Sequence, residues 1–176
     1  TILWQAEPGM GPYINNATNL VTDPTAWVHV VWLSFPSTEL PGGDQDVIYY
    51  GRWDGQNWTT PVDIFAGSTA QPLGGPVLLP TADGHLHILW ISGSYLMHSF
   101  AWADDAGRPQ AWSPPVTATA FLRPVFTPLD AAVDAQGTFH IVVTERVSHV
   151  YYTKSDDQGE TWSEQVVVAE VPPDIT

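Results

Sequence analysis

Arg123, Glu145 and Arg146 are the residues of this sequence that we predict to contact a ligand. A guanidinium group can fix an anion through two parallel hydrogen bonds, which makes arginine well suited to hold a carboxylate. All three residues follow strand-like apolar segments, where connecting loops are expected. Glu145 and Arg146 also fit a solvated strand end that carries a weak ion pair, and this alternative stays open. No residue is predicted to be catalytic.

Three histidines recur at equivalent places, with His29, His87 and His140 lying 58 and 53 residues apart. Imidazole is a common metal ligand, but these three belong to separate repeats. We therefore expect each to be hydrogen-bonded within its own repeat. His85 and His87 could share one face of a strand, yet no third ligand for zinc is evident. Asp156 and Asp157 suggest a calcium-binding loop, but too few oxygen ligands follow them at the spacing that such a loop requires. The sequence therefore predicts no metal and no cofactor.

The elements that position these residues form an internal repeat of about fifty residues. Its first strand-like segments are WVHVVWLS at 27–34, LHILWIS at 86–92 and FHIVVTE at 139–145. Each leads to a second apolar run and then to a polar turn that ends in a tryptophan. These tryptophans, Trp58, Trp112 and Trp162, lie 54 and 50 residues apart. A repeat of this length indicates stacked units, each too small to bury its own apolar surface.

Each repeat divides into four short strands with hairpin-type turns, the fourth beginning at the tryptophan. This pattern is typical of a β-propeller blade. We predict an all-β fold of three four-stranded antiparallel blades, over 16–66, 75–118 and 126–169, in a single domain spanning 1–176. Residues 1–5 are predicted to be a strand of an adjoining blade. A β-sandwich of about twelve strands is the alternative.

Three blades do not close a normal propeller ring, which typically has four to eight. The outer faces of the first and third blades would then be large apolar surfaces that need a cover. We predict that the chain is half of a six-bladed ring and that a homodimer closes it. The other possibility is that the chain belongs to a larger propeller.

One turn carries a specific motif, the segment SDDQGETW at 155–162. It matches Ser-x-Asp-x-Gly-x-Thr-Trp at every defined position, and it resembles the Asp-box, or BNR repeat, of the sialidase-like propeller superfamily. The resemblance implies a structural role, away from the ligand face, for Ser155, Asp157, Gly159, Thr161 and Trp162. An aspartate in a turn accepts backbone N–H groups, and glycine can take a positive φ.

The same resemblance places the binding face on the loops after the second strands and on the connections between blades. Arg123, Glu145 and Arg146 fall there, whereas Arg52 and Arg108 fall on the opposite side. Sialidases hold a carboxylate with three arginines and use a Tyr–Glu pair with an acidic Asp. At most two arginines lie on this face. We expect a non-catalytic module that binds glycan or protein; the alternatives are an exo-sialidase-type glycoside hydrolase active only in a complete ring, and a purely architectural self-assembling fragment.

Composition excludes several classes of partner. The formal net charge is −14 with five basic residues, so the clusters of Lys and Arg that bind nucleic acid or an anionic membrane are missing. There is no cysteine and hence no disulfide. No apolar run is long enough to span a bilayer. The acidity suits a soluble protein, and we expect an extracellular or cell-surface location.

Overall fold

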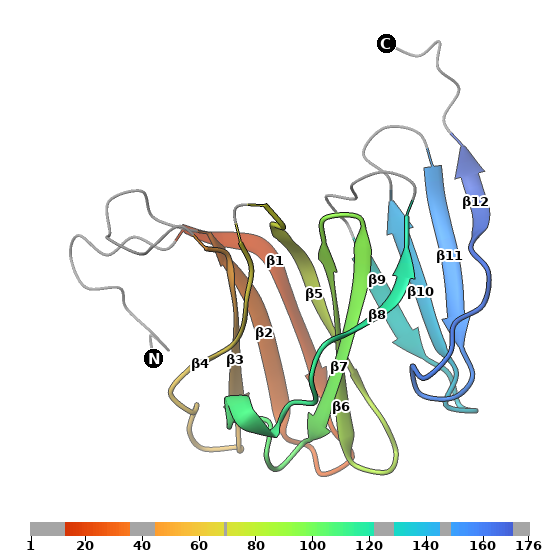
Figure 1. Cartoon of the computed structure of the whole chain (residues 1–176). Coiled ribbons are helices and arrows are strands. Elements are labelled where there is room, and N and C mark those ends of the chain that lie inside the picture. Colours follow the sequence, from red (N-terminus) through yellow and green to blue (C-terminus); the bar gives the residue numbers. More distant parts are fainter. Residues whose placement is uncertain (1–12, 36–44, 69, 122–128, 145–148, 171–176) are drawn as a thin grey trace.

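The computed structural model describes residues 13–35, 45–68, 70–121, 129–144 and 149–170, which form three four-stranded antiparallel sheets (Figure 1). Sheet 1 consists of β1 (Tyr13–Thr22), β2 (Val28–Phe35), β3 (Val47–Trp53) and β4 (Val62–Ala66). Sheet 2 consists of β5 (Leu73–Pro80), β6 (His85–Ser92), β7 (Tyr95–Trp102) and β8 (Val116–Ala120). Sheet 3 consists of β9 (Leu129–Val133), β10 (Phe139–Thr144), β11 (His149–Ser155) and β12 (Val166–Glu170). The prediction of three four-stranded antiparallel sheets is confirmed, and the two-sheet sandwich is wrong.

The fourth strand of each sheet begins four residues later than predicted, at Val62, Val116 or Val166. The residue after each tryptophan still makes one ladder-type bond, from Thr59 N to Arg52 O (2.8 Å), from Ser113 N to Phe100 O (2.8 Å) and from Ser163 N to Lys154 O (2.9 Å). The chain then leaves the ladder. In sheets 1 and 2 the cause is proline, which has no N–H to donate. A short 3-10 helix, η1 (Pro109–Ala111), was not predicted.

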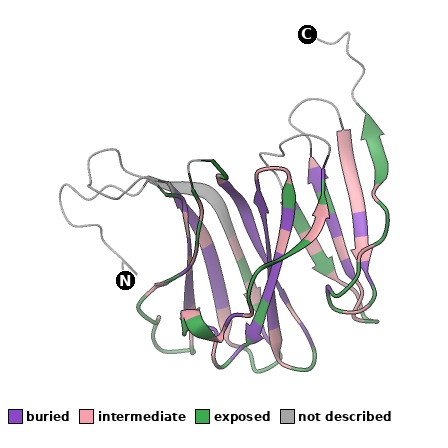
Figure 2. Ribbon diagram, viewed as in Figure 1, coloured by how far each residue is buried: buried purple, intermediate pink, exposed green. Residues whose placement is uncertain are grey.

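Sheet 2 lies between the other two, and its first two strands, β5 and β6, are buried on both faces. Along β6, Leu86, Ile88 and Trp90 pack toward sheet 1, while Leu89 and Ile91 pack toward sheet 3. This explains the continuous apolar run of β6, since neither face meets water. Figure 2 shows the buried residues concentrated in sheet 2, with β12 exposed along its length.

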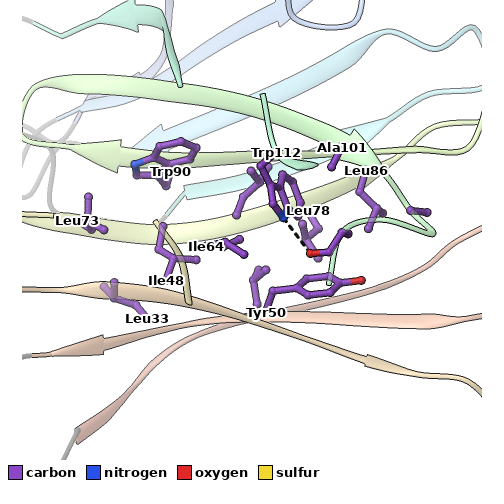
Figure 3. Packing of buried hydrophobic residues seen from close by; sticks show 14 residues of the cluster. Leu33, Ile48, Tyr50, Ile64, Leu73, Leu78, Leu86, Trp90, Ala101 and Trp112 are labelled. Carbon is purple, nitrogen blue, oxygen red and sulfur yellow. Dashed lines mark hydrogen bonds between the residues drawn. The ribbon is translucent and has the colours of Figure 1, made fainter. Parts of the chain in front are cut away.

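The core between sheets 1 and 2 is dominated by aliphatic side chains with a few rings (Figure 3). Tyr50 and Trp112 meet edge to face, with ring centroids 6.0 Å apart. Trp112 Nε1 donates to Ala106 O at 3.0 Å, which satisfies the indole N–H inside the core. The core thereby fixes the turn that contains η1 against sheet 1.

The connections between strands lie at two opposite ends of the three stacked sheets. We name the loop face as the end where β2 joins β3, β6 joins β7, and β4 runs into β5. We name the turn face as the opposite end, where the first and second strands and the third and fourth strands of each sheet are joined. Within the described ranges, no helix has the length and apolar character of a membrane span.

Candidate functional site

The three predicted ligand contacts, Arg123, Glu145 and Arg146, lie outside the described residues, so their role stays a prediction. Arg52 and Arg108 lie on the turn face. Arg52 Nη1 donates to Ala103 O at 3.1 Å, and its guanidinium stacks 3.7 Å from the centre of the Trp27 ring. Arg108 pairs with Asp105. Both cations are thus engaged in local structure.

The loop face carries a groove of about 310 Å³ between sheets 1 and 2. Its apolar part is built by Phe65 at the end of β4, with Trp90 and Met97 from sheet 2. The rings of Phe65 and Trp90 stack, with centroids 4.4 Å apart and planes inclined by 20°. Trp90 is buried and supports Phe65, which is partly exposed. The exposed side chains of Ser68 and Gln71 form the polar rim.

A buried carboxylate holds this rim in place. Asp46 O accepts a hydrogen bond from Gly67 N at 2.8 Å, and Asp46 Oδ2 accepts one from Leu73 N at 2.9 Å. Between these two points, Ser68 and Gln71 exchange backbone hydrogen bonds of 3.2 and 3.0 Å. Burial raises the pKa of Asp46. The side chain therefore acts as a clamp beneath the rim, and it does not line the groove.

Small-molecule sites usually combine an apolar surface, such as the aromatic ring of Phe65, with a few fixed polar groups beside it. Aromatic faces pack well against the apolar face of a sugar ring, while hydroxyl and amide groups bind its hydroxyls. The sequence interpretation assigned the connections between blades to the binding face but missed Phe65. Phe65 and Trp90 come from different sheets, so no local pattern indicates that they stack.

The Asp-box forms the turn between β11 and β12 on the turn face. Asp157 Oδ1 accepts from Thr161 N and from Ser155 Oγ, both at 2.8 Å, and Oδ2 accepts from Thr161 Oγ1 at 2.5 Å. Gly159 has φ +93°, and its carbonyl accepts from Trp162 Nε1 at 3.2 Å. The hydrogen bonds from Thr161 and Ser155 lower the pKa of Asp157 to about 2. A carboxylate so fully occupied is unsuited to proton transfer.

Other turn aspartates behave in the same way. Asp54 Oδ1 accepts from the backbone N–H groups of Gln56 and Asn57, and Asp134 Oδ1 accepts from those of Gln136 and Thr138. Hydrogen bonds also hold the pKa of Asp54 and of Asp134 below the ordinary value. A general acid for glycoside hydrolysis needs a raised pKa, so these groups do not supply one.

The recurring histidines are hydrogen-bonded inside their own sheets. His29 Nδ1 lies 2.7 Å from Tyr50 Oη, His140 Nδ1 lies 2.8 Å from Tyr152 Oη, and His87 Nδ1 lies 2.9 Å from His98 Nε2. Among the described residues, no three His, Asp or Glu side chains converge in a way that could hold a metal ion.

The fold of this chain is similar to that of several solved structures, although its sequence matches no known family. No protein-family model matches this sequence, and no curated protein matches it. Solved structures do match. The catalytic domain of the GH62 α-L-arabinofuranosidase from Coprinopsis cinerea is 13% identical with a TM-score of 0.62, over 94% of this chain and 56% of that one. The NanB sialidase from Streptococcus pneumoniae is 11% identical with a TM-score of 0.65, over 86% and 39%.

An α-L-arabinanase from Penicillium chrysogenum, solved with arabinobiose, is 19% identical with a TM-score of 0.61, over 85% of this chain and 49% of that one. At such identities the likeness shows the fold alone. The three sheets match part of propeller glycosidase structures, and the chain spans about half the length of these proteins or less.

Proposed function

We propose that this chain is part of a non-catalytic β-propeller that binds a glycan at its loop face. The observation that carries the proposal is the groove between sheets 1 and 2, where Phe65 presents a ring beside Ser68 and Gln71. The fold agrees with it, because the similar solved structures act on or contain carbohydrate. Arg123, Glu145 and Arg146 belong to the same proposal as further ligand contacts.

The hydrogen-bonded turn aspartates among the described residues support the non-catalytic part of the proposal. The turn aspartates are ionised and occupied by hydrogen bonds, and the buried Asp46 carboxylate is bonded to Leu73 N. A glycoside hydrolase active only in the complete ring is the second candidate. The similar structures favour it, since they include an arabinofuranosidase, an arabinanase and a sialidase.

Replacing Phe65 with leucine should weaken glycan binding at least tenfold, a loss of about 1.4 kcal/mol, because the stacking ring is removed while the apolar packing on Trp90 is kept. Binding would be measured on a glycan array and then by titration calorimetry with arabino-oligosaccharides and sialosides. Trp58→Leu, which changes a partly exposed ring on the turn face of sheet 1, away from the groove, is the control and should bind normally.

Three outcomes would redirect this proposal. Release of a chromogenic leaving group from an arabinofuranoside or a sialoside by the folded chain would favour the hydrolase. Equal binding by the parent chain and the Phe65→Leu variant would show that the groove is not the glycan-binding site. An array without any bound glycan would leave the architectural alternative.

The outer face of sheet 3 supports a ring that continues beyond this chain. His140 occupies the position of His29 and His87, and Val142 occupies that of Val31 and Leu89, two residues further along. Val31 and Leu89 are fully buried against the next sheet, whereas Val142 is 38% exposed. The face of the sheet that packs against the next sheet in sheets 1 and 2 is therefore exposed in sheet 3. We propose that a second copy of the chain covers this face in a six-bladed homodimer.

Light scattering at micromolar concentration should give twice the mass of 19.3 kDa. Val142→Asp should convert the dimer to a monomer, because it places a charge in the apolar contact. Gln136→Asp, an equal change of charge at an exposed turn position, is the matched control. A monomeric parent chain with a cooperative melt would contradict the homodimer.

A further inference from the structure

Sheet 2 departs from a polar network that the other two sheets share. In sheet 1, Asp23 Oδ2 lies 3.4 Å from His29 Nε2, and in sheet 3, Asp134 Oδ2 lies 3.1 Å from His140 Nε2. Each aspartate precedes its histidine by six residues, and its N–H donates to the residue four positions later. In sheet 2 the same place is taken by Thr81, whose N–H donates to His85 O at 2.9 Å.

His87 therefore lacks the carboxylate that its two counterparts have. The Thr81 hydroxyl is engaged with Asp83 Oδ1 at 2.5 Å and with His85 O at 3.1 Å. His87 is only 3% exposed, and its Nε2 has no hydrogen-bond partner among the described residues. A buried polar atom without a partner is energetically unfavourable, so a ligand that supplies a partner would gain from binding there.

A cleft of about 490 Å³ opens beside His87, between sheets 2 and 3 on the turn face. Its walls include His85, His87 and Phe100 from sheet 2, and Gln136, Gln158 and Glu160 from the turns of sheet 3. The volume lies in the range of small-molecule sites. Phe100 is 42% exposed, and the neighbouring Trp102 is 54% exposed and stacks on His85, with centroids 3.8 Å apart.

The chemistry of the walls favours a neutral ligand that carries hydroxyl groups. Desolvation lowers the pKa of His87 to about 3, so the imidazole is neutral and offers no charge to an anion. Of the three carboxylates in the walls, Asp157 is filled by its turn and Asp156 is paired with Lys154 Nζ at 2.8 Å, so Glu160 at the exposed rim is the one left to attract a cation. A hydroxyl both donates and accepts, so it satisfies either tautomer of His87.

We infer that this cleft is a second binding site, in which a neutral sugar packs on the exposed ring of Phe100 and one of its hydroxyls hydrogen-bonds to His87 Nε2. The site is separate from the loop-face groove and does not depend on it. Phe100 supplies the stacking surface, and the amides of Gln136 and Gln158 provide further hydrogen-bonding groups at the rim.

The test uses the chain with ¹⁵N-labelled imidazoles and, as probes, methyl β-xyloside and methyl α-arabinofuranoside. Choline serves as the cationic probe and a methyl sialoside as the anionic one. We expect a neutral glycoside to shift the Nε2 resonance of His87 with a Kd on the order of 1 mM. The charged probes should leave it unmoved. A shift caused only by choline or only by the sialoside, or by no probe at all, would overturn the proposal.

Two variants test the role of the missing carboxylate. Thr81→Asp gives sheet 2 the aspartate of the other sheets, so His87 gains an internal partner and binding of the glycoside should weaken at least tenfold. His87→Phe should do the same without adding charge near Asp83. His29→Phe, the equivalent change in sheet 1, is the control and should bind normally. Full binding by both folded cleft variants would refute the site. Phe65→Leu separates the two sites, because it should leave cleft binding intact.

Discussion

Gly159→Ala is expected to destabilise the chain by about 2–5 kcal/mol, from two costs that act together. Gly159 has φ +93°, where an L-residue is unfavourable. A methyl group there would also run into the His98 imidazole, with Nδ1 only 2.8 Å away. His98 has little freedom to move, since its Nε2 is hydrogen-bonded to His87 and the Trp162 ring meets it edge-on.

The free energy of unfolding from urea titration would measure this effect. Gly137→Ala and Gly55→Ala are matched controls, because their φ values are +86° and +95° and a methyl group at either position would touch nothing within 4 Å. They should lose only the backbone cost of about 1–2 kcal/mol. If Gly159→Ala lost no more than these two, the packing of the Asp-box turn against His98 would be wrong.

Acidification from pH 7 to pH 5 should lower the free energy of unfolding by about 4 kcal/mol, before the carboxylates titrate. Desolvation lowers the pKa of His87 to about 3 and that of His98 to about 4. The unfolded chain binds protons near the ordinary value of 6.5, while the folded chain does not until the pH is far lower. The contribution of these two histidines to the free energy of unfolding is therefore fully present above about pH 6.5. It falls as the pH decreases toward 4, by about 1.4 kcal/mol per pH unit for each histidine.

Urea titrations at several pH values between 7 and 5 would give the slope. His87→Phe removes one of the buried histidines and should lower the slope by about 1.4 kcal/mol per pH unit. Asp54→Asn is the control: backbone hydrogen bonds from Asn57 and Gln56 lower the pKa of Asp54, so its contribution is lost only in more acidic solution. No histidine is among the groups that shift this pKa, so the slope should stay as in the parent chain. A parent chain with equal stability at both pH values would show that these histidines are not buried in the neutral form.

The fold was predictable because its signal repeats. Three sets of apolar strands, each ended by a tryptophan turn, predict the sheets without any tertiary information. The strand boundaries were less accurate, since Trp58, Trp112 and Trp162 lie in turns and the fourth strands begin four residues later. Pro61, Pro114 and Pro115, which have no N–H to donate to the ladder, stand in the sequence just before the later starts of the fourth strands in sheets 1 and 2.

The candidate sites were harder to predict. Phe65 and Trp90 lie in different sheets, and no spacing in the sequence connects them. The departure at Thr81 did leave a signal, because aligning the three repeats on their histidines places it opposite Asp23 and Asp134. That alignment does not show that a cleft opens beside His87, since the far wall comes from turns at 136–137 and 156–160.

The sequence by itself determined the repeated sheets and the local chemistry of the turns. A turn such as the Asp-box is made by residues only a few positions apart, so its hydrogen bonds follow from residue type and spacing. Only the tertiary structure decided which polar atoms are left without partners and where grooves open. Those features depend on how separate sheets pack against one another, and the side chains that meet there are tens of residues apart along the chain.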